Sequence, residues 1–127
     1  MTRKEISPES VPAPVGGYSQ AIEISEPSRL LFISGQIPED VDGIVPGSFD
    51  EQCELVWRNI GEVLKSADMG YGNLVKVTTY LTHSDLAARN SEIRRKYLGD
   101  LRPALTVVVV TTLESKWLLE VEAVAAL

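Results

Sequence analysis

Hydrophobic residues recur along the chain at two periods, which together predict an α+β architecture. An apolar stripe with spacings of three and four residues runs through residues 48–67, as expected for a helix packed on one side. Residues 85–98 carry a second helical stripe, on which Asn90 falls at an inward position. A buried amide there could tether a neighbouring loop backbone or contact a ligand. Apolar runs or alternating residues typical of strands occupy 21–25, 30–33, 74–82, 105–110 and 117–125.

The order of these elements indicates that part of the sheet is covered from outside the chain. Two helices can cover only one face of such a sheet. Residues 105–110 are almost continuously apolar, which is typical of a strand covered on both faces, so we predict a central strand there. No further element remains for the second face, and this predicts a homo-oligomer with sites at its subunit boundaries.

Two carboxylates interrupt the last apolar run. Because strand side chains alternate between faces, Glu120 and Glu122 share a face with Leu118 and Val124. A charged side chain on an apolar strand is costly unless it is paired with an opposite charge, hydrated at a cleft, or part of a functional site. The pattern leaves two interpretations open, a half-exposed strand with a polar face or a carboxylate that lines a pocket.

Composition excludes several classes of function. A chain of 127 residues predicts one domain over 1–127, and its net charge of −6 argues against a nucleic-acid partner. Cys53 and His83 are the only residues of their types, which leaves no disulfide and no cysteine-cluster metal site. We therefore expect no metal and no cofactor. No apolar run has the length of a membrane span, so we expect no membrane contact and a cytoplasmic location.

Four segments resemble, in order and spacing, the successive motifs of the RidA/YjgF family of reactive intermediate deaminases, also called endoribonuclease L-PSP. They are Gly17–Ala21, Ser34–Pro38, Arg102–Ala104 and Glu120–Ala123. The resemblance covers nearly the whole chain. It implies a chorismate-mutase-like α+β fold with a mixed, mainly antiparallel sheet and two helices on one face. It also implies a homotrimer with ligand clefts between subunits.

The resemblance also implies site residues. Members of the best-known branch hydrolyse reactive imines or enamines to 2-oxo acids and ammonia. Carried over to this chain, the catalytic positions are Glu120, which positions the water, and Tyr18, which shapes the pocket. The substrate-binding positions are Ser34, Gly35, Asn90, Leu105 and Thr106.

Leu105 departs from the family pattern, because deaminating members carry an arginine there that grips the substrate carboxylate. Leucine offers no donor, whereas a guanidinium matches a carboxylate with two parallel hydrogen bonds. Arg102 lies an odd number of residues away, on the other face of an extended strand, and is a poor substitute. Gly17 also stands where the family's first motif commonly has a proline, and glycine makes the loop backbone more flexible there.

These observations predict a divergent RidA-like hydrolase or deaminase. Its substrate would be a small imine, enamine or related metabolite bound between subunits, with weak activity on 2-imino acids. The substrate would lack the usual carboxylate or present it elsewhere. The alternative is a non-catalytic trimeric module that binds a small molecule or another protein. Endoribonuclease activity is not expected from an acidic chain without a basic patch.

Overall fold

The computed structural model describes all residues from 1 to 127 and contains two helices and six strands. The helices are α1 (Phe49–Ser66) and α2 (Ala87–Leu98), and short 3-10 turns lie at Tyr71–Asn73 and Ser84–Leu86. The strands are β1 (Thr2–Ile6), β2 (Ala21–Ser25), β3 (Leu30–Gln36), β4 (Leu74–Leu81), β5 (Ala104–Val109) and β6 (Leu119–Ala126).

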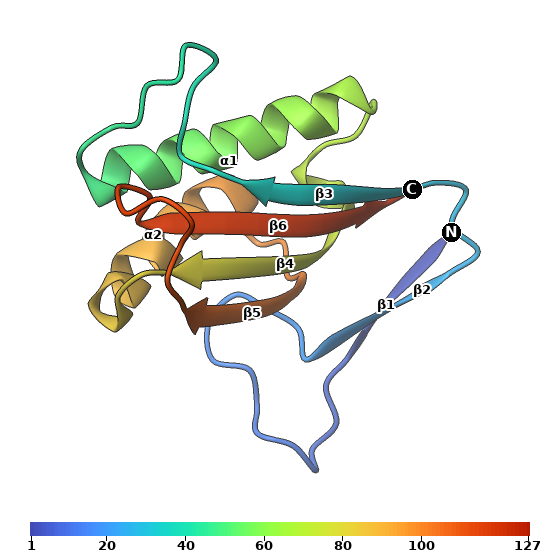
Figure 1. The fold of residues 1–127 in the computed structure, drawn as a ribbon. Coiled ribbons are helices and arrows are strands. Elements are labelled where there is room, and N and C mark those ends of the chain that lie inside the picture. Colours follow the sequence, from blue (N-terminus) through green and yellow to red (C-terminus); the bar gives the residue numbers. More distant parts are fainter.

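Four strands form the main sheet, in the order β3-β6-β4-β5. Strand β6 is antiparallel to both β3 and β4, whereas β5 runs parallel to β4. Both helices lie behind this sheet and cover the same face (Figure 1). The α+β class and the position of two helices on one face are therefore confirmed.

The hydrophobic core lies between the helices and the sheet, and strict alternation on β6 builds the sheet side of it. Leu119, Val121, Ala123 and Ala125 are buried toward the helices, so Glu120 and Glu122 point to the opposite, open face. The α1 stripe supplies the other side, with Trp57 fully buried. Ser48 caps α1 through its Oγ, which accepts from the Glu51 amide at 3.2 Å.

The N-terminal strand was not predicted from the sequence. Strand β1 pairs with β2 in a separate antiparallel ribbon, so β2 does not belong to the main sheet. Four of the five β1 residues are exposed, and the strand lacks the apolar alternation that marks a half-buried strand. The Arg3 guanidinium ties the ribbon to the sheet by donating to the Leu74 carbonyl at 2.9 Å.

The prediction of a central strand at 105–110 is wrong for the single chain. Strand β5 is an edge strand. It pairs with β4, and its first residue, Ala104, forms one isolated bridge with Ser19. Residues 106–109 are all exposed. A continuous apolar run indicates burial but does not say whether the cover comes from the same chain. An exposed apolar edge of this kind favours pairing or packing with another chain.

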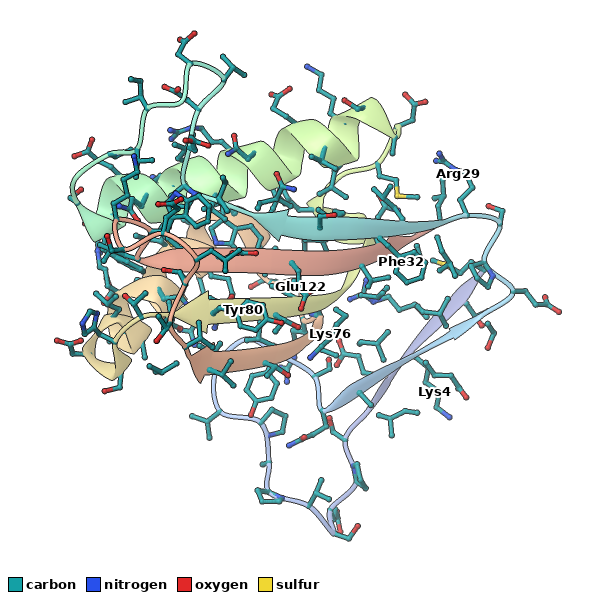
Figure 2. All side chains as sticks on the ribbon, in the orientation of Figure 1. Lys4, Arg29, Phe32, Lys76, Tyr80 and Glu122 are labelled. Carbon is teal, nitrogen blue, oxygen red and sulfur yellow. The ribbon has the colours of Figure 1, made fainter.

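The open face of the main sheet has no cover within the chain. Figure 2 shows Lys76, Tyr80 and Glu122 on this face, with Phe32 beyond them on β3. The Phe32 ring is 74% exposed, although it lies in the middle of a strand. This arrangement agrees with the sequence-based inference that the chain has no element for its second sheet face.

Candidate functional site

A bulge in β3 brings the second and fourth sequence motifs into contact. Ile33 pairs with Ala123 and Gln36 pairs with Val121, so β3 contains one extra residue over this stretch. The bulge places Gly35 against the Glu120 side chain. A Cβ added at Gly35 would lie 1.9 Å from Glu120 Oε2, so the carboxylate occupies the space of the missing side chain.

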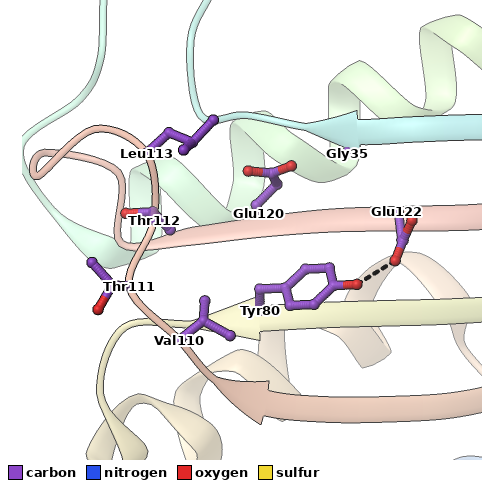
Figure 3. Close-up of a pocket in the computed structure, with 8 residues that line it drawn as sticks. All are labelled: Gly35, Tyr80, Val110, Thr111, Thr112, Leu113, Glu120 and Glu122. Carbon is purple, nitrogen blue, oxygen red and sulfur yellow. Dashed lines mark hydrogen bonds between the residues drawn. The ribbon is translucent and has the colours of Figure 1, made fainter.

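Glu120 lines a cavity of about 340 Å³ on the open face of the sheet (Figure 3). Its other lining residues come from β3, β4, β6 and the segment after β5: Gly35, Tyr80, Val110, Thr111, Thr112, Leu113 and Glu122. Tyr80 lies opposite Glu120 in the strand register, and its hydroxyl donates to the Glu122 carboxylate. This hydrogen bond, with burial and the two carboxylate charges, raises the pKa of Tyr80.

Tyr80 was not among the residues predicted for the site. The signal was present in the alternation of β4, where Val77, Thr79 and Leu81 are buried toward the helices. The intervening residues must then face the open side, which places Tyr80 beside the carboxylates of β6. Three ionisable side chains therefore line the cavity: Tyr80, Glu120 and Glu122.

Replacing Gly35 by alanine tests whether the position of the Glu120 carboxylate matters. The new methyl group would displace the end of a flexible side chain, so we expect the melting temperature to change little. If Glu120 places a reacting water, we expect turnover to fall by about 100-fold, since a misplacement of 1 Å can cost that much. Ammonia release and thermal unfolding of both proteins measure the two effects, and unchanged turnover would contradict the role of Glu120.

The first and third motifs also meet, at a different place. The Ser19 amide donates to the Pro103 carbonyl at 3.1 Å, and Ser19 Oγ donates to the Arg102 carbonyl at 2.7 Å. Arg102 Nη2 donates to the Tyr18 carbonyl at 3.1 Å. These bonds hold the Tyr18 loop against the start of β5 and engage Arg102 with the backbone.

Leu105 and Thr106 point to opposite faces of β5. Leu105 lies opposite Val77 in the register and packs against the core on the helix side. Thr106 lies on the open face, where its Oγ1 accepts from Lys76 Nζ at 2.6 Å. Only one of these two predicted substrate-binding side chains can therefore face a given cleft.

Asn90 is buried between the two helices. Its Oδ1 accepts from the Cys53 thiol, with a sulfur–oxygen distance of 3.8 Å, and the side chain makes no hydrogen bond to a loop backbone. Burial raises the pKa of Cys53 to about 12, with nearby acidic side chains adding to the effect. A thiol with so high a pKa is a poor nucleophile at neutral pH.

Comparison with known proteins agrees with the order of the four motifs. The sequence model of the Endoribonuclease L-PSP family matches residues 8–127. This protein belongs to the RidA/YjgF family. A RutC family protein of Pyrococcus abyssi is 37% identical over 127 residues, covering 98% of both chains. A 2-iminobutanoate/2-iminopropanoate deaminase of Mus musculus is 34% identical over 125 residues, covering 97% of this chain and 90% of the relative.

The fold of a solved Rid family protein is similar as well. The crystal structure of YyfB from Yersinia pestis superposes with a TM-score of 0.86 at 31% sequence identity, and the match covers 100% of both chains. Membership of the RidA/YjgF family thus rests on sequence and on structure over the same length of chain.

The positions that the RidA/YjgF resemblance assigns to the site do not come together in one chain. Gly35 lies with Glu120 in the cavity of Figure 3, and Ser34 precedes Gly35 on β3. Only Gly35 and Glu120 of the predicted site residues line the cavity. The others do not: Tyr18, Ser34, Asn90, Leu105 and Thr106. A single chain therefore does not assemble the complete set.

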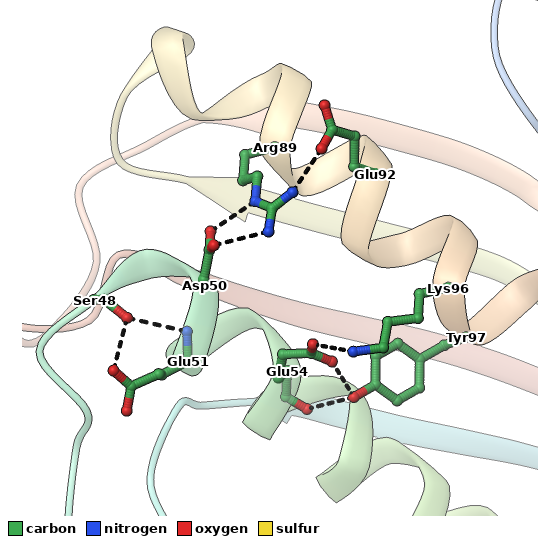
Figure 4. Close-up of polar contacts among 8 residues, drawn as sticks. All are labelled: Ser48, Asp50, Glu51, Glu54, Arg89, Glu92, Lys96 and Tyr97. Carbon is green, nitrogen blue, oxygen red and sulfur yellow. Dashed lines mark hydrogen bonds and ion pairs between the residues drawn. The ribbon is translucent and has the colours of Figure 1, made fainter.

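A polar network of this RidA/YjgF protein lies outside the candidate site. An exposed network joins α1 to α2, in which Arg89 pairs with Asp50 and Glu92, while Lys96 and Tyr97 contact Glu54 (Figure 4). Each charged group in it already has a partner, and exposed ion pairs of this kind contribute little to stability.

No group of three or more histidine, cysteine or acidic side chains is placed to hold a metal ion. Neither helix is long and apolar enough to cross a membrane.

Proposed function

We propose that this protein is a RidA-like hydrolase that deaminates a small imine or enamine. The observation that carries the proposal is the Glu120 carboxylate, which lies over Gly35 in a cavity lined by threonines and tyrosine. Relatives that match nearly the full chain are named for deamination of 2-iminobutanoate and 2-iminopropanoate. The proposed domain spans residues 1–127.

The proposed chemistry is addition of water to a carbon–nitrogen double bond. The water oxygen adds to the imine carbon, and the proton that it loses passes through the Glu120 carboxylate to the nitrogen. The product of this addition is a carbinolamine. Its hydroxyl proton then passes to the nitrogen, the carbon–nitrogen bond breaks, and the carbon–oxygen bond becomes a carbonyl double bond. One imine and one water thus give one carbonyl compound and one ammonia, and no redox step or cofactor is required. Tyr18 would close the pocket around the substrate.

We further propose a chorismate-mutase-like homotrimer in which neighbouring copies complete the site. The open sheet face and the apolar edge of β5 support this, because both need a cover that the chain itself does not supply. The separation of Glu120 from Tyr18 and Leu105 also supports it, since a second copy could bring these residues close to Glu120. A cytoplasmic location remains a prediction from the sequence.

Substitution of Phe32 by glutamate tests the assembly. In the single chain this ring is exposed, so the charge should disturb the fold little but should oppose burial against another copy. We expect light scattering to give a trimer for the wild-type protein and a monomer for Phe32→Glu at micromolar concentration. Val41→Glu is the matched control, because Val41 is fully exposed on a loop away from the sheet. A monomeric wild-type protein would contradict the shared-site proposal.

Leu105 favours a second candidate, a trimeric binding module that has lost catalysis. The position offers no donor for a substrate carboxylate. Ammonia release across a panel of imines generated in situ separates the two candidates, because a module would bind without turnover. The net charge of −6 opposes an RNA backbone, so we do not propose the endoribonuclease activity in the family's name.

A further inference from the structure

The Glu120 carboxylate has no partner within the chain. None of the four ion pairs and none of the side-chain hydrogen bonds involves it, although it lines the cavity of Figure 3. The other carboxylate of the cavity, Glu122, accepts from the Tyr80 hydroxyl and lies beside Lys76, with which it lines a neighbouring hollow. The Lys76 ammonium donates to Thr106 and does not line the Glu120 cavity. Glu120 is therefore the carboxylate that is free to contact a ligand.

The cavity offers little that could hold an anion. None of its eight lining residues is basic. Of its three hydroxyls, that of Tyr80 donates to Glu122, and that of Thr112 donates to the Glu114 carbonyl at 2.9 Å. A ligand carboxylate would face two carboxylates here, and like charges brought together without a counterion oppose binding. The charges of the cavity thus favour a cation.

The cavity also has an apolar part. Val110 and Leu113 line it together with Glu120 (Figure 3). These two side chains can cover an alkyl group of a ligand. A carboxylate in the same place would lose water without gaining a partner.

We propose that this cavity binds the protonated form of an imine, an iminium cation, whose carbon atoms carry no carboxylate. The inference rests on the proposed function, whose substrate it narrows. A carboxylate has two oxygens, so one oxygen of Glu120 can accept from the iminium N–H while the other accepts from the attacking water.

The cationic substrate changes the proton balance of the reaction but not its order. The water oxygen adds to the iminium carbon, and the proton that it loses passes through Glu120 to the nitrogen. The carbon–nitrogen bond then breaks, and the leaving ammonia takes the remaining hydroxyl proton as the carbonyl forms. One iminium ion and one water thus give one carbonyl compound and one ammonium ion.

The class of substrate indicates the class of reaction that supplies it. An imine without a carboxylate forms by two-electron oxidation of a primary amine. The two electrons pass to the flavin or quinone cofactor of the amine-oxidising enzyme. 2-Imino acids come from amino acids instead.

Binding of three small ligands, measured by calorimetry without turnover, tests the proposal. sec-Butylammonium is 2-aminobutanoate with a methyl group in place of the carboxylate, and 2-methylbutanoate is the anion that lacks the ammonium group. We expect the wild-type protein to bind sec-butylammonium at least about tenfold more tightly than either of the others, the difference expected for one charge-assisted contact.

Glu120→Gln should weaken sec-butylammonium binding by at least about tenfold, because the amide has no charge to offer the ammonium group. Glu62→Gln is the matched control. It removes the same charge from an exposed position on α1, which covers the other face of the sheet, and it should bind as wild type does (Figure 1).

Turnover gives a second readout. We expect kcat/KM for butan-2-imine, generated from sec-butylamine by an amine oxidase, to exceed that for 2-iminobutanoate by at least about tenfold. Tighter binding of either carboxylate ligand would show that a neighbouring copy supplies a cation, and would overturn the proposal. Absence of sec-butylammonium binding, or equal binding by wild type and Glu120→Gln, would also overturn it.

The two proposals fail in different ways. If sec-butylammonium binding depends on Glu120 but neither imine is deaminated, the preference of the cavity for cations stands and the hydrolase function fails. If 2-iminobutanoate is deaminated more efficiently than butan-2-imine, the hydrolase function stands and this inference fails.

Discussion

Replacement of Glu120 by glutamine is expected to lower ammonia release from the protein's imine substrate by about 100- to 10,000-fold, the usual contribution of a general base. The amide keeps the shape of the side chain over Gly35 but cannot accept the proton of the attacking water. Steady-state ammonia release at saturating substrate measures the effect. Thermal unfolding should change little, because the carboxylate lies in an open-face cavity rather than in the core.

Glu122→Gln is the control for this experiment. Glu122 lines the same cavity, carries the same charge and accepts from the Tyr80 hydroxyl. We expect it to keep most of the activity, because the proposed proton acceptor is Glu120. Equal losses in the two variants would show that the negative potential of the cavity matters, rather than the position of one carboxylate. Full activity in Glu120→Gln would contradict the proposed hydrolytic mechanism.

Substitution of Leu105 by arginine is expected to improve activity on 2-iminobutanoate by about one to two orders of magnitude. A charge-assisted hydrogen bond contributes about 1.5–3 kcal/mol, and each 1.4 kcal/mol is about tenfold in rate. The wild-type protein should be correspondingly weak on this substrate and on 2-aminoacrylate. Leu105 packs against the core, so the new guanidinium must extend to the edge of β5, and the gain will be partial.

Leu105→Met is the matched control, because it keeps the volume and the apolar character of the side chain without adding a charge. Ammonia release from enzymatically generated 2-iminobutanoate should be the same for this variant and the wild type. Robust wild-type turnover would contradict the interpretation that Leu105 has replaced an arginine needed to bind the substrate carboxylate.

Much of the architecture could be predicted because it depends on local periodicity. The stripe of α1, its cap at Ser48 and the alternation of β6 each involve residues close together in sequence. The two-helix cover of one sheet face followed from counting such elements. Strand β1 was not predicted because its sequence shows no alternation of apolar and polar residues. Its partner β2 is also separated from it by a long loop.

The sequence by itself determined the family, the α+β class and the two carboxylates of one strand face, because motif order and side-chain alternation are local properties. Only the tertiary structure decided that β5 is an edge strand and that a bulge places Glu120 over Gly35. These features depend on which distant segments pair and on what covers each side chain. A pattern of apolar and polar residues does not contain that information, since the same pattern is compatible with cover from the chain or from another copy.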